Sequence, residues 1–294
     1  VVAICTAGTT PPVCASVALF AVDDMRIGDA WTVTPALRYE TSKITGSTAP
    51  NDGTHEIDAL MGGLSVRYAF GSGLALFGSA AYTEGLPIID DLATASAITQ
   101  SEKSRTFELG ASFERADLFQ SGDNFAIKGV VYQTSLYDVT SYLVPGVRPP
   151  APALDEIETE GLEVEVSYAM ESGLYMDLNA NVVNGTEFGP GLPATDWRNS
   201  PADSVRFTLG KKFGDELDLS WEVVAHKSID TGTASASGFG IHNLRATYVP
   251  QSGVLKDTQI RLGIENAFDR DYTPHLSTRP APGRNIKLSL SRVF

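Results

Sequence analysis

Long apolar runs are missing from this sequence. Of the 294 residues, 43% are hydrophobic and 20% are charged, yet no stretch of about 18 consecutive apolar residues occurs, so the chain has no candidate transmembrane helix. The same composition excludes long disorder and collagen. The first residues, VVAICTAGTTPP, lack the basic stretch and apolar run of a signal peptide. We therefore expect a mature chain or one that begins within a longer precursor.

Basic residues and cysteines are also scarce. Lys and Arg number 22 against 36 Asp and Glu, which argues against a nucleic-acid partner because such a protein carries a basic face. The two cysteines, Cys5 and Cys14, are too few for a disulfide framework, but they could close one small loop in an oxidising compartment. Metal or redox chemistry is the alternative role for this pair, and we predict the disulfide.

Sequence motifs of enzymes are absent. The chain has no Gly-x-Ser-x-Gly elbow, no His-Glu-x-x-His, no phosphate loop and no Cys-x-x-Cys, which are the short patterns that carry hydrolytic, metal or redox chemistry. The glycines of GFGIHN lack the strand–turn–helix context that nucleotide binding requires. The sequence therefore predicts no enzyme, no catalytic residues, no bound metal and no cofactor.

What the sequence does have is alternation of apolar and polar side chains with a period of two. The clearest runs are residues 107–113, 162–170, 174–182, 217–225, 260–268 and 286–294. Such alternation predicts β-strands with one apolar and one polar face. Most runs approach the about 9–11 residues that a tilted strand needs to cross a bilayer, and they exceed the roughly 5–6 residues of a typical strand.

The connections between these runs alternate between short and long. Short turns such as FGSGL, MESGL and FGDEL are built on Gly with Asp or Ser, as tight hairpins require. Longer polar connections are expected at 45–57, 85–103, 140–158, 188–204, 228–238 and 270–282. An outer-membrane barrel sorts its connections in this way, with short periplasmic turns and long extracellular loops. The predicted fold class is therefore all-β, a transmembrane antiparallel β-barrel.

The polar rows carry carboxylates such as Glu163 and Glu165, which stand two residues apart on one predicted strand. Such a pair could serve as general acid and base, but nearly every strand carries a similar polar row. A water-filled lumen explains all of these rows together, and the apolar rows then face lipid.

The expected strand count is about 13, which is odd, whereas a bacterial single-chain barrel normally has an even number. An odd set leaves unpaired backbone at two edges, which hydrocarbon does not tolerate. We therefore expect residues 16–294 to be the C-terminal part of a larger barrel, completed by a separate chain, a cleaved segment or further sequence. Residues 1–15, with Cys5 and Cys14, are expected to form an extracellular loop segment.

Two stretches resemble TonB-dependent outer-membrane receptors. The ending ENAFDRDYTPHLSTRPAPGRNIKLSLSRVF is similar to the C-terminal signature of that family, and ALFAVDDMRIGDAWTVTPALRYE, with Arg38 and Tyr39, looks like a mid-barrel hairpin of it. The signature positions are Asn266, Phe268, Asp269, Tyr272, Pro282, Gly283, Arg284 and Phe294.

The resemblance implies a barrel of about 22 strands, the size class of plugged outer-membrane transporters. This chain would supply the last 13 or so strands without the plug domain. The resemblance further implies uptake of a scarce, bulky nutrient such as a ferric siderophore, haem or cobalamin, energised by an inner-membrane TonB-type complex. The expected partners are outer-membrane lipid, the missing N-terminal portion and the iron chelate or haem. A passive pore or structural subunit, and an outer-membrane hydrolase, remain the alternatives.

Ligand contacts are expected in the extracellular loops. His55 and His275 fall in predicted loops, and His275 stands near Tyr272 and Arg279, so contact with an iron porphyrin or a catecholate is a hypothesis for these four residues. The segment RPAPGR in the last loop resembles the haem-uptake branch of the family. The alternative is that each histidine is an ordinary solvated side chain.

Overall fold

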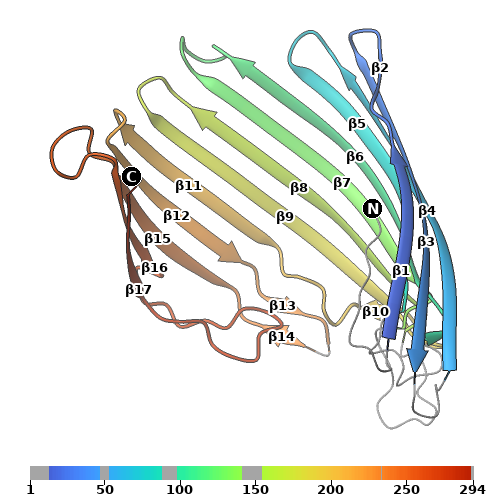
Figure 1. Ribbon diagram of the computed structural model, residues 1–294. Coiled ribbons are helices and arrows are strands. Elements are labelled where there is room, and N and C mark those ends of the chain that lie inside the picture. The colour runs from blue at the N-terminus through green and yellow to red at the C-terminus, as the bar shows by residue number, and fades with distance from the viewer. Residues whose placement is uncertain (1–12, 47–52, 88–97, 141–153, 233, 293–294) are drawn as a thin grey trace.

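The computed structural model describes residues 13–46, 53–87, 98–140, 154–232 and 234–292. Across these ranges, thirteen strands form one antiparallel path in which each strand pairs with the next long strand along the chain. Figure 1 shows the strands tilted and side by side, from β1 at one end of the sheet to β17 at the other. The predicted all-β fold and the predicted strand count are both confirmed.

The thirteen strands of the path have the following bounds: β1 (Val13–Val22), β3 (Trp31–Gly46), β4 (Gly53–Ala69), β5 (Leu74–Gly85), β6 (Glu102–Ala116), β7 (Asn124–Tyr137), β8 (Glu156–Ala169), β9 (Leu174–Phe188), β11 (Ser204–Phe213), β12 (Leu217–His226), β15 (Phe239–Tyr248), β16 (Thr258–Glu265) and β17 (Asn285–Arg292). Four short strands accompany them: β2 (Met25–Ile27) beside β3, β10 (Thr195–Asp196) beside β9, and β13 (Ile229–Asp230), which pairs with β14 (Ser235–Ala236).

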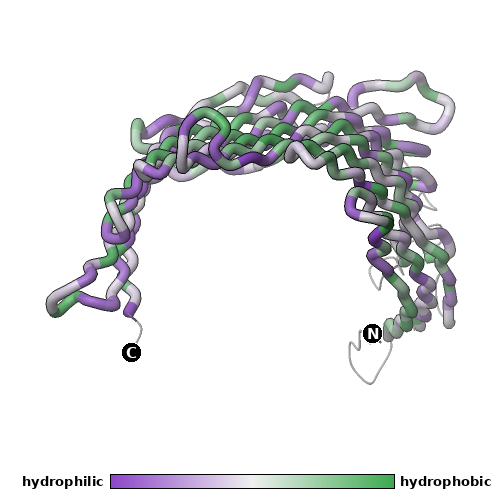
Figure 2. The backbone as a smooth tube through the Cα atoms, turned by 90° about the horizontal axis from the view of Figure 1, so that it is seen from above, coloured by the Kyte–Doolittle hydropathy of each residue, from purple (hydrophilic) through white to green (hydrophobic). Residues whose placement is uncertain are grey.

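The sheet is a partial barrel. Seen from above, it bends into an open arch with the N-terminal and C-terminal strands at its two ends (Figure 2). In the described residues, β1 and β17 each pair on one side only, so each presents a free edge of backbone donors and acceptors. No helix in the described ranges is both long and apolar enough to cross a membrane.

One apolar face runs unbroken across the sheet, because directly paired residues point to the same side. Along one row, Leu109 pairs with Val131, which pairs with Leu162, which pairs with Val182. Near the C-terminus, Leu262 pairs with Leu288, whose side chain is 74% exposed. Large apolar side chains remain exposed along this whole face, as expected where lipid rather than protein covers them.

The polar face is the concave one. A hollow of about 340 Å³ on this face gathers side chains from strands β4 to β9, among them Arg67, Lys128 and Asn179. Only the inner side of a curved sheet brings such distant strands around one space. The sequence-based assignment of the polar rows to the lumen therefore agrees with the curvature of the wall.

Aromatic side chains gather at the short-turn end of the convex face. Trp31 and Tyr68 lie 4.7 Å apart between ring centroids, and Phe119 lies 5.7 Å from Tyr168. Their arrangements are edge-to-face, the favourable geometry for aromatic pairs. Such a belt is typical of the membrane interface of an outer-membrane barrel.

Rings on the concave face lie over glycines of neighbouring strands. Gly210 pairs with Tyr175, and a Cβ added at Gly210 would overlap the ring of Tyr175. Gly161 stands in the same relation to Tyr132. These glycines leave the room that lets an aromatic ring lie flat on the sheet, a known device for pinning register.

Two sequence-based boundaries need correction. His55 was expected in a loop at 45–57, but β3 and β4 continue to Gly46 and from Gly53, and His55 pairs with Ile44. The sequence becomes polar where the strands leave the apolar band, and it therefore resembles a loop. Backbone pairing nevertheless continues there. Likewise β1 begins at Val13, so Cys14, which was expected in the loop segment 1–15, lies in a strand.

Cys14 is buried, clusters with Ile44 and Ile98, and forms no disulfide with another described residue. Its predicted partner, Cys5, lies outside the described residues, so the disulfide stays a prediction. The signature residue Phe294 also lies outside the described ranges.

Candidate ligand pocket at the loop end

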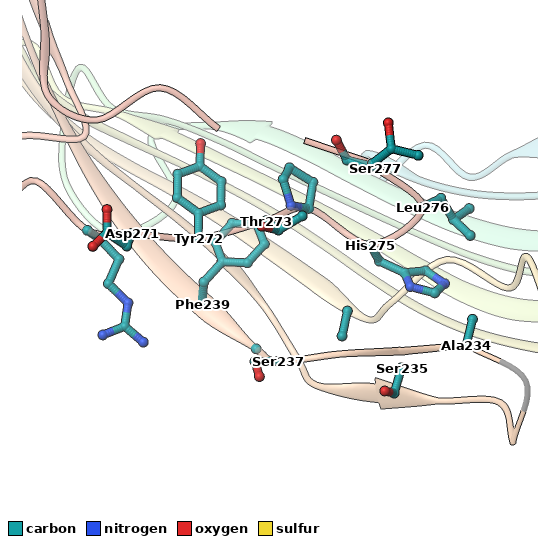
Figure 3. Close-up of a pocket in the computed structure, with 15 residues that line it drawn as sticks. Ala234, Ser235, Ser237, Phe239, Asp271, Tyr272, Thr273, His275, Leu276 and Ser277 are labelled. Atoms are coloured by element: carbon teal, nitrogen blue, oxygen red, sulfur yellow. The ribbon is translucent and has the colours of Figure 1, made fainter. Parts of the chain in front are cut away.

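A pocket of about 560 Å³ lies at the end of the sheet that carries the long connections. One side is formed by residues 234–239, which include β14 and the start of β15. The other side is formed by residues 270–278 of the last connection, between β16 and β17. Figure 3 shows the two segments facing each other across the pocket.

Aromatic rings from the two sides of the pocket meet at one end of it. The rings of Phe239 and Tyr272 lie 4.3 Å apart between centroids, and Figure 3 shows them side by side. Behind them, His226 stacks on Phe239 at 4.8 Å. Of the three rings, Phe239 of β15 and Tyr272 of the last connection line the pocket, and they offer an apolar surface of the kind that ligand sites use.

His275 supplies an unpaired nitrogen. Its Nε2 atom is buried and has no hydrogen-bond partner within the described part of the chain. The next residue, Leu276, has a φ of 65°, a left-handed conformation that costs energy for a side chain of this kind. An unpaired buried polar atom is also costly, so a ligand that bonds to Nε2 would relieve this cost.

The base of the last connection is held by hydrogen bonds of the Asn266 side chain. This residue is 3% exposed and has a φ of 49°. Its Oδ1 accepts a hydrogen bond from the Arg270 backbone N–H at 2.8 Å, and its Nδ2 donates to the Arg270 carbonyl at 2.8 Å and to the Pro282 carbonyl at 3.4 Å. The amide of Asn266 therefore ties both ends of the connection together.

A second contact closes the same base. Oδ1 of Asp269 accepts a hydrogen bond from the Arg284 backbone N–H at 2.7 Å, and Nε of Arg284 donates to the Ala267 carbonyl at 2.9 Å. A Cβ at Gly283 would lie 2.7 Å from Asp269 Oδ1, which explains the glycine. Several residues of the predicted C-terminal signature thus shape the connection, and Tyr272 is the one among its described residues that lines the pocket.

The four residues predicted to contact ligand are divided by the structure. Tyr272 and His275 both line the pocket, whereas Arg279 lies just beyond it, where its carbonyl accepts a hydrogen bond from Ser277 Oγ at 2.9 Å. His55 lies in β4 and is not part of the pocket lining. Phe239 was missed by the sequence analysis, because nothing in its local pattern distinguishes it from other aromatic residues at strand ends.

The signature residue Phe268 does not line the pocket. It is 73% exposed, and its ring meets His242 edge-to-face at 4.8 Å. Nδ1 of His242 in turn accepts a hydrogen bond from Trp221 Nε1 at 3.1 Å. Trp221 and His242 pair with Leu244 and Val223 in the apolar rows, so this cluster belongs to the convex face.

Sequence comparison connects this architecture to a family. Residues 11–267 match the sequence profile described as TonB dependent receptor-like, beta-barrel. The chain belongs to the TonB-dependent receptor family. The receptor barrel is accordingly an outer-membrane protein, and the resemblance first noted in its last residues extends over most of the chain.

Individual relatives are more distant. The chain is 24% identical over 205 residues to Heme/hemopexin utilization protein C of Haemophilus influenzae (strain 86-028NP), a match that covers 66% of this chain and 29% of the relative. It is 31% identical over 120 residues to TonB-dependent heme receptor A of Haemophilus ducreyi, covering 36% of this chain and 16% of the relative. The FrpB iron transporter from Neisseria meningitidis (F3-3 variant) superposes with a TM-score of 0.75 at 18% identity, covering 95% of this chain and 45% of that one.

These matches show a shared fold over part of longer proteins. The chain spans less than a third of the curated relatives and less than half of the solved transporter. At 18% identity, the likeness to that transporter concerns the fold alone.

Proposed function

We propose that this chain is the C-terminal barrel portion of a receptor that takes up haem, or a related iron chelate, across the outer membrane. The observation that carries the proposal is the loop-end pocket, whose lining includes the paired rings of Phe239 and Tyr272 and a histidine with a buried, unpaired nitrogen. Two curated relatives with heme in their names support the choice of ligand.

The pocket suits a flat iron porphyrin on physical grounds. Its volume of about 560 Å³ falls within the roughly 300–1,000 Å³ of small-molecule sites. The paired rings of Phe239 and Tyr272 can lie against an apolar macrocycle, and imidazole nitrogen and phenol oxygen are both known protein ligands of haem iron. His275 Nε2 is the atom that we assign to the iron.

Transport would need parts beyond this chain. The expected partners are a domain that fills the lumen, an energising TonB-type complex that acts through that domain, and the lipid around the convex face. The open arch supports the need for a completed barrel, because its two free edges require partners within a membrane.

The two alternative functions gain less support. A hydrolase would need a hydroxyl or carboxylate bonded to a histidine, but His275 Nε2 has no such partner among the described residues, and the family consists of receptors. A passive pore would conduct ions in single-channel recordings of the complete protein, whereas a receptor with a filled lumen would be nearly silent.

The direct test is haem titration of the complete purified receptor, followed by the Soret absorbance band. His275→Ala should weaken binding at least about tenfold, the equivalent of 1.4 kcal/mol, and should shift the band because an iron ligand is lost. His55→Ala is the matched control and should leave both unchanged, since His55 lies on β4 outside the pocket lining. Unaltered binding by His275→Ala would refute the assignment.

A further inference from the structure

A buried carboxylate lies on the concave face, between the pocket and the short-turn end of the sheet. Glu222 of β12 is 5% exposed. Its Oε1 accepts hydrogen bonds from Asn243 Nδ2 at 2.7 Å and from Arg245 Nη2 at 3.0 Å, and Arg206 Nη1 lies 3.8 Å from its Oε2. The two guanidinium groups come from β11 and β15, the strands on either side of β12.

The hydrogen bonds continue from Glu222 to the last connection. Asn243 is 6% exposed, and its Oδ1 accepts a hydrogen bond from the Asn266 backbone N–H at 2.9 Å. Asn266 holds the backbone of Arg270 through its side-chain amide, and Arg270 lines the pocket. An unbroken path therefore leads from the lumen wall to the edge of the pocket.

Both walls of the pocket depend on the same strand. Phe239 begins β15 and lines one side, while Asn243, further along β15, anchors the connection that carries Tyr272 and His275. The Asn243 side chain thus connects the two sides of the pocket, and Glu222 accepts a hydrogen bond from it.

An exposed ion pair of the concave face provides a contrast. Lys128 and Glu165 lie 3.9 Å apart with side chains that are 48% and 58% exposed, and exposed pairs of this kind contribute little. Removing a partner from a buried, hydrogen-bonded carboxylate is much more disruptive, because it leaves polar groups unpaired.

We infer that Glu222 and Asn243 are positioning residues of the ligand pocket. They fix the base of the last connection, so that Tyr272 stays against Phe239 and His275 faces residues 234–239. Neither residue lines the pocket. The inference rests on the proposed function only for its effect on ligand affinity, and its effect on the connection can be measured without ligand.

The first measurement is amide hydrogen exchange of the complete purified receptor without ligand. Asn243→Ala and Glu222→Ala should speed exchange at residues 266–284 and leave the turn at 117–123 unchanged. Glu222→Gln should lie closer to the parent protein, because the amide keeps an oxygen that accepts from Asn243. Glu165→Gln is the matched control, and it should leave residues 266–284 unaffected.

The second measurement is haem affinity of the same variants by Soret titration. We expect Asn243→Ala and Glu222→Ala to bind about fivefold more weakly, the effect of one net hydrogen bond, and Glu165→Gln to match the parent. If exchange at 266–284 is faster in these variants than in the parent, and the parent does not bind haem, the positioning role is supported and the haem proposal is refuted.

Unchanged exchange at 266–284 in a correctly assembled Asn243→Ala variant would overturn the inference. Assembly is checked by the gel mobility shift of the folded barrel on heating. If Glu222→Ala fails to assemble, Asn243→Ala and Glu222→Gln decide the question, because neither removes the side chain that meets the two arginines.

Discussion

The convex and concave faces of this wall are built from alternate residues of the same strands, yet they obey opposite rules. On the convex face, Leu288 is 74% exposed, whereas on the concave face the charged residue Glu222 is 5% exposed. Most of the convex face carries apolar side chains, because lipid adapts to their shape. The concave face depends on particular partners, such as the ring of Tyr175 over Gly210. Within the described strands, buried charges with particular hydrogen-bond partners therefore belong to the concave face, whereas the convex face leaves large apolar side chains exposed.

The largest expected effect separates the two faces at neighbouring positions. Leu288→Arg places a charge on the lipid face near the middle of β17, at a cost of about 2–4 kcal/mol, and should block assembly into outer membranes. Lys287→Gln removes an exposed ion pair with Glu265, 2.7 Å long, and should assemble normally. Folded barrel in membrane fractions, measured by heat-dependent gel mobility, distinguishes the outcomes. Equal yields of the two variants would contradict the assignment of faces.

A smaller effect should separate two glycines of the concave face. Gly210→Ala forces a methyl group against the Tyr175 ring, and such overpacking costs roughly 1–3 kcal/mol. Gly263→Ala meets nothing within 4 Å and should leave stability almost unchanged. Urea unfolding of both barrels in lipid vesicles measures the difference. A Gly210 variant as stable as the parent would show that the lumen side tolerates substitution as freely as the lipid side.

The smallest effect is expected at the short turn 117–123, where the convex aromatic belt meets water. Asp123 accepts hydrogen bonds from Tyr168 and from the backbone N–H groups of residues 118–120. Burial alone would raise the pKa of Asp123, but these hydrogen bonds, that of Tyr168 foremost, outweigh it and lower the pKa below its ordinary value.

A lowered pKa means that the ionised Asp123 stabilises the fold at neutral pH, and that this contribution is lost as the pH falls below about 4. Asp123→Asn should therefore lower the thermal midpoint at pH 7. The gap between variant and parent should narrow as the pH is lowered towards 3. A gap that stays constant with pH would show that the charge of Asp123 does not hold the turn.

Much of the fold follows from the sequence, because period-two alternation directly encodes a two-faced strand. The strand count, the two faces and the short turns were all predicted correctly. The strand ends next to the long connections were not predicted correctly, since polar sequence does not stop a strand that has already left the bilayer. His55 illustrates this, as do β13 and β14, which form a small hairpin inside a predicted loop.

The pocket was only partly predictable. Tyr272 and His275 could be named because they are iron-ligand types in a long connection. Phe239 and Asn243 could not, because their roles depend on which residues stand opposite them on neighbouring strands. Asn243 pairs with Glu222, and a shift of register by one residue would turn its side chain to the lipid face. Register is set by the whole sheet and cannot be read from one strand.

The two-faced wall is tested most directly by single spin labels placed in turn at residues 286–290 of β17, in a receptor in which Cys5, Cys14 and any further cysteine are replaced by serine. In lipid vesicles, collisions with oxygen should peak at 286, 288 and 290, and collisions with a water-soluble nickel chelate should peak at 287 and 289. If collisions with oxygen and with the chelate peaked at the same residues, or if neither alternated from one residue to the next, the result would contradict a strand that separates lipid from the lumen.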